Sequence, residues 1–547
     1  MLIALSGLSC TLIVDRKLRA GIGAPCSIDD ECQAGTCAQG SCTAACSTDT
    51  DCPAPSLCFS TQCRVGCRVD GQCAAPSVCV DSSCASPIAA AALFGGPTNG
   101  EDGWSTANRV GLDEATTALR YMRFDGEGYR HKELLRTTED VATAMEQFLA
   151  EGASMIVTTS PEGAAEALLK ARAHPSTRFV VAGATSNGGL ANVGAYSAKS
   201  EQGWYVAGRV AALASERVNK CIGLVLPTPT KAIVRETNAF VRGAKFQEPA
   251  IKVVIRWLGA TKDPSPPGNE YAARNYPFKT ATTGPLLREE LLAAQLADLG
   301  CGVVAHRTET QRTVAFVDHT LAPLVASSTR PFPLFSLGVD ARDACKANVD
   351  PHGVWAPTCL ASLYWNWGPT YQRVFDQVRR GVWTGTVDIA AFRTDAAALV
   401  KLELNPSLSS ASAIGTEEVD HLLKDAADAG FDAVFRGPYD FHGQRDLDGD
   451  GIADPSEQSV GAGTPLSPQE LEKMCWFVDG AYELADPNVV TIEGLTPALV
   501  PYGPPLSSGS TTLDPKNPAD LQKYGDVIQF LAKLGRDPAS VMSCALH

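Results

Sequence analysis

The sequence predicts an α/β protein with two doubly wound lobes that resemble Rossmann folds, preceded by a small disulfide-rich repeat stalk. From about residue 88, short apolar runs alternate with amphipathic helical stretches, which is the pattern of repeated β–α units around a parallel sheet. These apolar runs predict more strands than one sheet would hold, which indicates two lobes. In addition, 13 of the 19 cysteines fall within the first 84 residues, and the 547-residue chain has room for two or three domains.

The first ten residues, MLIALSGLSC, are apolar and end in small residues and a cysteine. This segment is similar to the end of a bacterial lipoprotein signal peptide, so we expect residues 1–10 to be a signal-peptide remnant and Cys10 to be lipidated. Residues 11–25 then form a linker. The chain is expected in a bacterial cell envelope, periplasmic or surface-facing, with a membrane as partner through the lipid anchor. An unpaired Cys10 in a truncated leader is the alternative.

Residues 26–84 contain three repeats of four cysteines each, and the second and third repeats share identical spacing. Each repeat is too small to bury a core, so two disulfides are expected to stabilise it in an oxidising compartment. Four cysteines allow three pairings, and the spacing does not choose among them. A spacer role is favoured over recognition of a partner. The twelve cysteines are Cys26, Cys32, Cys37, Cys42, Cys46, Cys52, Cys58, Cys63, Cys67, Cys73, Cys79 and Cys84.

The two-lobed body is expected over residues 86–482, with a lobe boundary near residue 216. Thr137 and Asp140 have the spacing of a helix cap, and the apolar residues that follow recur at helical intervals. Residues 260–285 are predicted to form a loop insertion, and residues 485–547 are predicted to form a C-terminal extension. The other predicted elements are strands over 88–96, 155–160, 179–183, 222–226, 252–259, 302–306 and 333–338, and helices over 201–216 and up to Gly300.

Six further cysteines lie in the body and the extension, an even number that suits a secreted domain. Cys221 and Cys301 each open a predicted strand, so they are expected to pair across neighbouring strands. The remaining expected pairs are Cys345 with Cys359 and Cys475 with Cys544.

The segment DLDGDGIADPSE at 446–457 has the pattern of a calcium-binding loop. Gly451 supplies the turn, and the flanking residues contain Gly and Pro in place of clear helices. We therefore expect a structural Ca²⁺ that holds this loop together. The alternative is a solvated acidic turn without an ion. The candidate ligands are Asp446, Asp448, Asp450, Ile452 through its carbonyl, Asp454 and Glu457.

Composition and motifs argue against several classes of function. The formal net charge is −15, and lysines and arginines do not cluster with aromatic residues, so nucleic acid is not an expected partner. The sequence contains no GxSxG, HExxH or GxxxxGK[ST] motif, so we predict no enzyme, no catalytic residues and no catalytic cofactor. His306 at a strand end is the best isolated candidate for proton transfer, but without a partner in view it is interpreted as a hydrogen-bonded structural histidine.

Polar and aromatic residues follow several predicted strands, where ligands bind in open α/β sheets. Indoles that stack on a flat ring, together with a carboxylate that accepts hydroxyl protons, would suit a nucleoside. Packing between the lobes is the alternative reading of each aromatic residue. The candidate ligand-binding residues are Glu101, Asp102, Trp104, Thr159, Ser160, Asp340, Asn366 and Trp367.

Several runs occur in an order that resembles the basic membrane protein family of bacterial solute-binding lipoproteins. They include GPTNGEDGWSTANRVG, EGASMIVTTS, RFVVAGATSNGGLANVGAYSAKSEQGWYVAG, SLGVDAR and LYWNWGPTYQRVFDQVRRGVW, and the resemblance covers about residues 88–482. It implies a fold similar to type I periplasmic binding proteins, with two lobes that close on a purine nucleoside and deliver it to an ABC importer. By that resemblance Trp104 stacks on the base and Asp340 meets the ribose. Glu101 stands where the family usually has Asp.

The sequence therefore predicts an extracytoplasmic solute-binding lipoprotein whose partners are a nucleoside-like small molecule and an ABC transporter permease. The alternative is an envelope receptor that senses or contacts a protein through the stalk and the extension. A hydrolase on the same two-lobed scaffold is the third reading.

Overall fold

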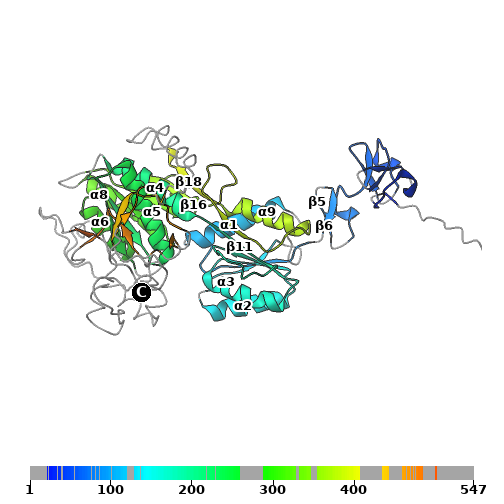
Figure 1. Ribbon diagram of the computed structural model, residues 1–547, viewed down its shortest axis with the longest axis horizontal. Coiled ribbons are helices and arrows are strands. Elements are labelled where there is room, and N and C mark those ends of the chain that lie inside the picture. Colours follow the sequence, from blue (N-terminus) through cyan, green and yellow to red (C-terminus); the bar gives the residue numbers. More distant parts are fainter. Residues whose placement is uncertain are drawn as a thin grey trace, which may run out of the picture. The chain divides into compact units, whose positions relative to one another are not determined.

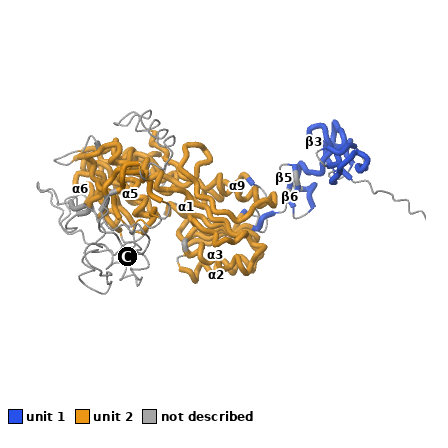
Figure 2. Tube along the Cα trace, in the orientation of Figure 1, with its two compact units in different colours: residues 1–89, 119–128 blue, residues 90–118, 129–547 orange. Residues whose placement is uncertain are grey.

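The computed structural model describes two compact units (Figure 2), made of residues 1–89 with 119–128, and 90–118 with 129–547. The described residues are 21–22, 24–33, 35–38, 41–53, 56–74, 77–80, 82–85, 87–99, 102–119, 128–135, 137–216, 219–227, 230–258, 288–327, 332–346, 354–406, 434–442, 459–463, 465–467, 470–471, 474, 476–484 and 499–501.

Unit 1 consists of three modules, each with a short 3₁₀-helix followed by a β-hairpin. The elements are η1 (Asp29–Glu31), β1 (Thr36–Ala38), β2 (Ser41–Thr43), η2 (Asp49–Asp51), β3 (Ser56–Phe59), β4 (Gln62–Val65), η3 (Asp70–Gln72), β5 (Val78–Val80) and β6 (Ser83–Ala85). In each module the first cysteine bonds the third and the second bonds the fourth. The disulfides are Cys26–Cys37, Cys32–Cys42, Cys46–Cys58, Cys52–Cys63, Cys67–Cys79 and Cys73–Cys84.

Hydrogen bonds to side chains hold the turns of these modules, because so little apolar surface is available. The Asp29 carboxylate accepts the Cys37 backbone N–H at 2.7 Å, and Asp49 accepts that of Cys58 at 2.9 Å. Arg68 of the third module donates to the Asp49 carboxylate at 2.9 Å and to the Cys58 carbonyl at 2.7 Å. Arg68 thus joins the second module to the third.

The first sheet of unit 2 has the order β17-β11-β10-β9-β7-β8 within the described residues, and all its strand pairs are parallel. Helices α2 and α3 lie on one face, and α1 and α9 on the other (Figure 1). The strands are β7 (Ala90–Leu93), β8 (Arg130–Lys132), β9 (Met155–Thr158), β10 (Arg178–Ala182), β11 (Val193–Ala198) and β17 (Val387–Ala390). The helices are α1 (Gly103–Ala118), α2 (Thr138–Ala150), α3 (Pro161–Ala173) and α9 (Trp367–Arg379).

The second sheet has the order β18-β16-β15-β14-β12-β13-β22-β23 within the described residues, and only β18 and β23 run antiparallel to their neighbours. Its strands are β12 (Cys221–Leu226), β13 (Lys252–Trp257), β14 (Val303–His306), β15 (Phe335–Asp340), β16 (Cys359–Trp365), β18 (Val400–Leu404), β22 (Ala481–Leu484) and β23 (Leu499–Pro501). Its helices are α4 (Ser200–Glu216), α5 (Lys231–Gln247), α6 (Arg288–Asp298), α7 (Arg312–Phe316), the π-helical turn η5 (Val317–Leu321) and α8 (Ala322–Ala326).

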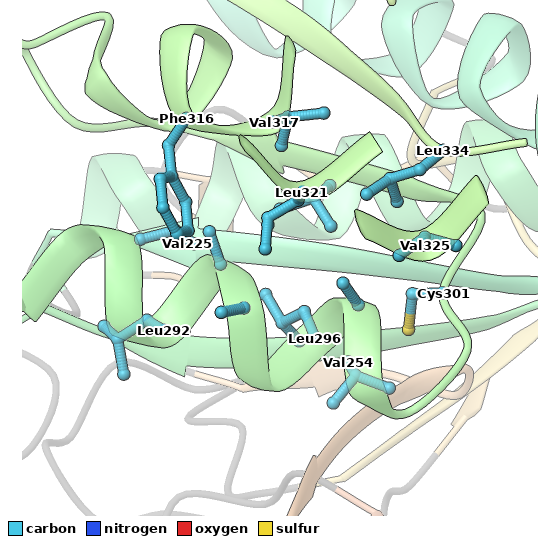
Figure 3. Close-up of a cluster of buried hydrophobic side chains, with 14 of the residues drawn as sticks. Val225, Val254, Leu292, Leu296, Cys301, Phe316, Val317, Leu321, Val325 and Leu334 are labelled. Carbon is cyan, nitrogen blue, oxygen red and sulfur yellow. The ribbon is translucent and has the colours of Figure 1, made fainter. Parts of the chain in front are cut away.

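A core cluster fixes α6 on this sheet. Leu292 and Leu296, one turn apart on α6, face Phe316 and Leu321 of the following helical segment (Figure 3). All four are buried. Cys301 beside them bonds Cys221, and Cys345 bonds Cys359. These are the two disulfides of the described part of unit 2.

Within the described residues the chain passes between the two sheets three times, at 198–200, 365–367 and 390–400. The prediction of two parallel α/β lobes is confirmed. The first passage differs from the expected boundary near 216, because α4 packs on α5 and on strands of the second sheet and so belongs to the second lobe. The sequence pattern could not show this, since α4 is apolar enough to cover either sheet.

Residues after 434 complete the second lobe. A small sheet of order β20-β19-β21, formed by β19 (Tyr439–His442), β20 (Ser459–Val460) and β21 (Phe477–Val478), is anchored to α5. Asn238 on α5 donates to the Trp476 carbonyl at 2.6 Å and accepts the Val478 N–H at 3.0 Å. Because β22 and β23 extend the second sheet, this lobe continues past the expected boundary at 485. No helix in the described ranges is long and apolar enough to cross a membrane.

Candidate ligand-binding cleft

The candidate site lies where α1 follows β7 and meets the carboxyl ends of β14 and β15. Asp102 caps α1, accepting the Ser105 N–H at 2.8 Å. The Asp102 carboxylate lies against Gly96, where an added Cβ would come within 1.8 Å of Asp102 Oδ2. Glycine at position 96 is therefore what lets the capping carboxylate approach the backbone.

Trp104, in the first turn of α1, is fixed in place by two contacts with the first lobe. Its indole N–H donates to the Thr159 carbonyl at 2.7 Å, beyond the end of β9. Its ring covers Gly183, where an added Cβ would lie 3.1 Å from the Trp104 Cζ2 atom. The other side of the Trp104 ring meets Trp365 edge to face, with ring centres 5.0 Å apart.

Asp340 ends β15 in a left-handed conformation, with φ +66° and 3% exposure. Arg307 donates to its Oδ2 at 2.9 Å, and Trp365 lines the same small cavity as Asp340. Burial raises the pKa of Asp340 to about 6, and the attraction of Arg307 opposes that rise. The carboxylate is thus ionised at neutral pH and positioned as a hydrogen-bond acceptor.

Arg307 joins Asp340 to a second buried carboxylate. It donates from Nε to Glu236 Oε2 at 2.7 Å, and Ser200 Oγ donates to the other Glu236 oxygen at 2.5 Å. Burial lowers the pKa of Arg307, but Asp340 and Glu236 more than offset this, so the net shift is upward. Asp102 also raises the Asp340 pKa. Asp340 therefore has one guanidinium, Arg307, and two further carboxylates, Glu236 and Asp102, in its surroundings.

The two lobes contact each other at this site. The Gly103 N–H donates to the Glu309 carbonyl at 2.6 Å, across from the first lobe to the second. The cavity beside Asp340 measures about 10 Å³ and is lined by Ser200, Trp204, Asp340, Leu363, Tyr364, Trp365 and Val400. A cavity of that size holds about one water molecule. The two lobes are therefore in contact at this site.

The segment that carries Glu309 is held by a buried carboxylate. Glu289 on α6 accepts the hydroxyls of Thr308 at 2.8 Å and of Thr310 at 2.7 Å, and the backbone N–H of Thr313 at 3.2 Å. It also accepts the Thr313 hydroxyl at 2.8 Å. Glu289 thus ties the segment after β14 to α6 and fixes the part of the second lobe that meets Gly103.

The structure brings Asp102, Trp104, Thr159 and Asp340 of the predicted set together. Thr159 acts on Trp104 through its carbonyl, and its hydroxyl donates to the Leu93 carbonyl at 3.2 Å. Ser160 differs from the expectation of ligand contact, because its hydroxyl caps α3 by accepting the Gly163 N–H at 3.0 Å.

Asn366 and Trp367 also differ from the expected ligand contacts. The Asn366 amide donates to the Ala396 and Ala398 carbonyls, each at 3.0 Å. Trp367 is 1% exposed, stacked between Trp365 and Tyr371 with ring centres 5.7 and 5.5 Å away. The partly exposed neighbour of Trp367 is Trp365, which the sequence reasoning missed. Trp365 ends β16 and lines the cavity together with Leu363 and Tyr364 of the same strand.

Arg307 and Glu236 were also missed, because an arginine after a strand and a glutamate within a helix carry no distinctive sequence signal. Several predicted residues lie outside the described residues. They are Glu101, Cys10, Cys475, Cys544 and the calcium-loop residues Asp446, Asp448, Asp450, Ile452, Asp454 and Glu457. The strands nearest that loop are described: β19 before it and β20 after it pair antiparallel, with Asp440 opposite Ser459.

The chain is similar to known proteins in sequence and in structure. Residues 103–276 match the family described as ABC transporter substrate-binding protein PnrA-like, or Bmp. A Haloferax volcanii protein, named as a candidate ABC transporter glucose-binding protein, is 23% identical over 256 residues, which are 46% of this chain and 52% of that protein. The chain therefore spans about half the length of this curated relative.

Solved structures of ABC transporter solute-binding proteins also match. One from Conexibacter woesei is 17% identical, with 62% of this chain and 97% of that chain covered and a TM-score of 0.41. Another from Aeropyrum pernix is 15% identical, with 64% and 89% covered and a TM-score of 0.45.

Proposed function

From the match of residues 103–276 to the PnrA-like substrate-binding proteins of ABC transporters, we propose that this chain is an extracytoplasmic solute receptor. The two lobes of unit 2 enclose a small molecule and present it to the permease of an ABC importer. The chain binds its ligand without chemical turnover.

The ligand proposed is a purine nucleoside. The observation that carries this proposal is that Trp104 and Asp340 come from different lobes and lie at the same lobe contact, where an added Cβ at Gly103 would come within 2.9 Å of the Asp340 Cβ. Trp104 is held rigidly by Thr159 and offers an aromatic face for a base. Asp340 is ionised and buried, so it can accept hydrogen bonds from sugar hydroxyls.

The charge of the cleft supports a neutral ligand. Asp340, Glu236 and Asp102 outnumber Arg307, and both carboxylates bonded to Arg307 are nearly fully buried. A phosphate group would meet net negative charge in a setting of low dielectric, which is unfavourable. A nucleoside is therefore favoured over a nucleotide.

Calorimetry on the full chain with inosine, adenosine, guanosine, their monophosphates and glucose tests this proposal. We expect at least one nucleoside to bind and the monophosphates not to bind. Trp104→Ala should weaken nucleoside binding at least tenfold because the stacking on the base is lost. Asp340→Asn should weaken it at least tenfold because a charge-assisted hydrogen bond is lost. Phe246→Ala, an exposed aromatic on α5, is the control and should bind as wild type. Binding of glucose without binding of any nucleoside would contradict the nucleoside proposal and identify the ligand as a sugar.

We also propose a structural Ca²⁺ in the loop at 446–457 and lipidation of Cys10. The proposal is supported by the ligand pattern of the segment and by the pairing of the described strands β19 and β20 on either side of it, with Asp440 opposite Ser459. Ca²⁺ should raise the melting temperature of chelator-treated protein, and Asp448→Asn with Asp450→Asn should abolish that rise. Equal melting temperatures with and without Ca²⁺ would contradict the proposal of a bound ion.

Mass spectrometry of membrane-extracted protein tests whether Cys10 carries a lipid.

A further inference from the structure

Four polar side chains form one continuous chain of hydrogen bonds that ends at Asp340. Arg307 Nη1 donates to Asp340 Oδ2 at 2.9 Å, and Arg307 Nε donates to Glu236 Oε2 at 2.7 Å. Ser200 Oγ donates to the other Glu236 oxygen at 2.5 Å. Ser200, Glu236 and Asp340 are 8%, 4% and 3% exposed. Because water has so little access to these groups, each bond holds its partner firmly in place.

The four residues come from four different elements of the second lobe. Arg307 directly follows β14, Asp340 ends β15 and Glu236 lies on α5. Ser200 is the first residue of α4, at the end of the first passage between the lobes. The hydrogen bonds therefore run from the proposed ligand acceptor to the segment that joins the two lobes.

The way in which Arg307 divides its N–H groups determines how much of Asp340 it occupies. An arginine pairs most strongly with a carboxylate through two parallel N–H···O bonds, which take both carboxylate oxygens. Here Glu236 accepts from Nε, and Arg307 gives Asp340 a bond to Oδ2. Asp340 Oδ1 is thus not committed to Arg307.

Glu236 reaches a ligand beside Asp340 only through Arg307. Ser200 and Asp340 both line the small cavity at this site, whereas Glu236 is not among the described residues that line it. Any effect of Glu236 on ligand binding is therefore an effect on the position of Arg307, or an effect of its charge. The two can be separated by substitution.

We propose that Glu236 is a positioning residue for ligand recognition and that Ser200 holds Glu236 in this role. The inference rests on the proposed function of Asp340 as the ligand acceptor. Glu236 keeps the Arg307 Nε away from Asp340, and Ser200 fixes the Glu236 carboxylate. Without either bond the guanidinium turns to occupy both Asp340 oxygens, and it then competes with a ligand hydroxyl. Through Ser200, the orientation of Asp340 is linked to the first passage between the lobes.

Two substitutions at position 236 separate position from charge. Glu236→Gln keeps the length of the side chain and removes its charge, whereas Glu236→Asp keeps the charge and withdraws the carboxylate from Arg307. We expect both to weaken the binding of inosine, adenosine or guanosine about tenfold in calorimetry, since a hydrogen bond to a charged group is worth about that factor. Wild-type affinity in Glu236→Asp would overturn the proposal, because charge alone would then be sufficient.

Ser200→Ala tests the next bond and should weaken nucleoside binding about threefold to tenfold. Ser200→Thr keeps a hydroxyl and should bind more tightly than Ser200→Ala. Ser215→Ala is the matched control, because Ser215 is a fully buried serine later on α4 whose hydroxyl donates to the Cys221 carbonyl at 2.7 Å. It should lose stability and keep its affinity. Equal affinities in Ser200→Ala and Ser215→Ala would overturn the role of Ser200.

Thermal unfolding without ligand separates this inference from the proposed function. The shifts in melting temperature caused by Ser200→Ala and Asp340→Asn should not be additive in the wild-type background, and they should become additive once Glu236→Gln is present. Glu236→Asp serves as that background if circular dichroism shows that Glu236→Gln is unfolded.

The outcomes of this cycle are distinct. Additive shifts in the wild-type background would overturn the inference, because Ser200 and Asp340 would then be independent. Non-additive shifts that persist without Glu236 would also overturn it, because the two residues would then interact directly. Coupling through Glu236 in a protein that binds no nucleoside would reject the proposed ligand and keep Glu236 as the residue that positions Asp340.

Discussion

His306 is a fully buried histidine at the end of β14. Its Nδ1 lies 2.9 Å from the Thr308 hydroxyl, so it belongs to the same segment that Glu289 holds. Burial lowers its pKa to about 3 from 6.5. The interpretation of His306 as structural agrees with this environment, in which the imidazole is neutral.

We predict that His306 makes the second lobe sensitive to acid. Because the folded pKa lies below the unfolded one, its stabilising effect is full above pH 6.5 and is lost as the pH falls toward 3. Between pH 7 and pH 5 the wild type should lose about 2 kcal/mol more than His306→Asn. Urea unfolding at both pH values measures this difference. His319→Asn, at an exposed histidine, should behave as wild type, and parallel losses in all three proteins would contradict the prediction.

The places of Trp104 and Asp340 near the carboxyl ends of strands could be predicted from sequence, because Trp104 follows the apolar run at 88–96 across a short polar loop and Asp340 follows the run at 333–338. Trp365 could not be distinguished from Trp367 in the same way. The strand-to-helix junction falls between the two residues, and whether an aromatic residue ends a strand or begins a helix decides whether it faces the cleft. Local sequence does not set that junction within two residues.

At the scale of elements, α4 and α5 approach each other closely through two glycines. An added Cβ at Gly208 on α4 would lie 2.0 Å from the Phe240 carbonyl oxygen. An added Cβ at Gly243 on α5 would lie 1.9 Å from the Tyr205 carbonyl oxygen. Each helix thus presents a glycine to the backbone of the other, and no side chain fits between them.

We predict that Gly243→Ala and Gly208→Ala each destabilise the second lobe by about 1–3 kcal/mol, the usual range for overpacking. Alanine favours the helix over glycine by about 1 kcal/mol, and the predicted net loss of stability already includes that gain. Gly203→Ala on α4 would meet only the side-chain ends of Leu363 and Val400, at 2.8 and 2.9 Å, so it should lose less. Thermal unfolding of the three variants tests the order, and a larger loss at Gly203 would refute it.

The central strands of both sheets could be predicted because they are buried on both faces and form continuous apolar runs. The strands β17, β18, β22 and β23 could not. They occupy outer positions, and β17 alternates exposed and half-buried residues. Their partners are distant in sequence, as in the pairing of β11 with β17, so no local pattern identifies them.

At the scale of the whole of unit 2, hydrogen bonds tie the three passages between the lobes to one another. Lys199 of the first passage donates its N–H to the Ala390 carbonyl at 2.8 Å. Gln202 accepts the Phe392 N–H at 2.8 Å. Asn366 of the second passage donates to two carbonyls of the third. The passages therefore bend together.

We predict that Asn366→Ala loosens the hinge. Loss of two hydrogen bonds should lower stability by about 1–2 kcal/mol, and X-ray scattering should show a more open ligand-free protein. Asn405→Ala is the matched control, because Asn405 donates to the Ala356 and Cys359 carbonyls at 2.9 and 2.8 Å inside the second lobe. It should lose similar stability without opening. Equal scattering from both variants would remove the hinge role of Asn366.

The two-lobed architecture could be predicted from the length of the β–α alternation, and the expected boundary near 216 could not be placed correctly. Helix α4 follows a strand of the first sheet without a break in pattern, and only its packing on α5 assigns it to the second lobe. Periodicity reports that a helix has a buried face and does not report which sheet covers it.

The interleaved path of the chain has a consequence for synthesis on the ribosome. The first sheet gains its edge strand β17 only from residues 387–390, after β12 to β16 have been made. The second sheet gains β22 and β23 later still. Neither lobe can therefore finish folding before most of the chain has emerged from the ribosome. Until then, the strands of each sheet that are synthesised first have a partly exposed edge, because the strand that covers it is translated several elements later.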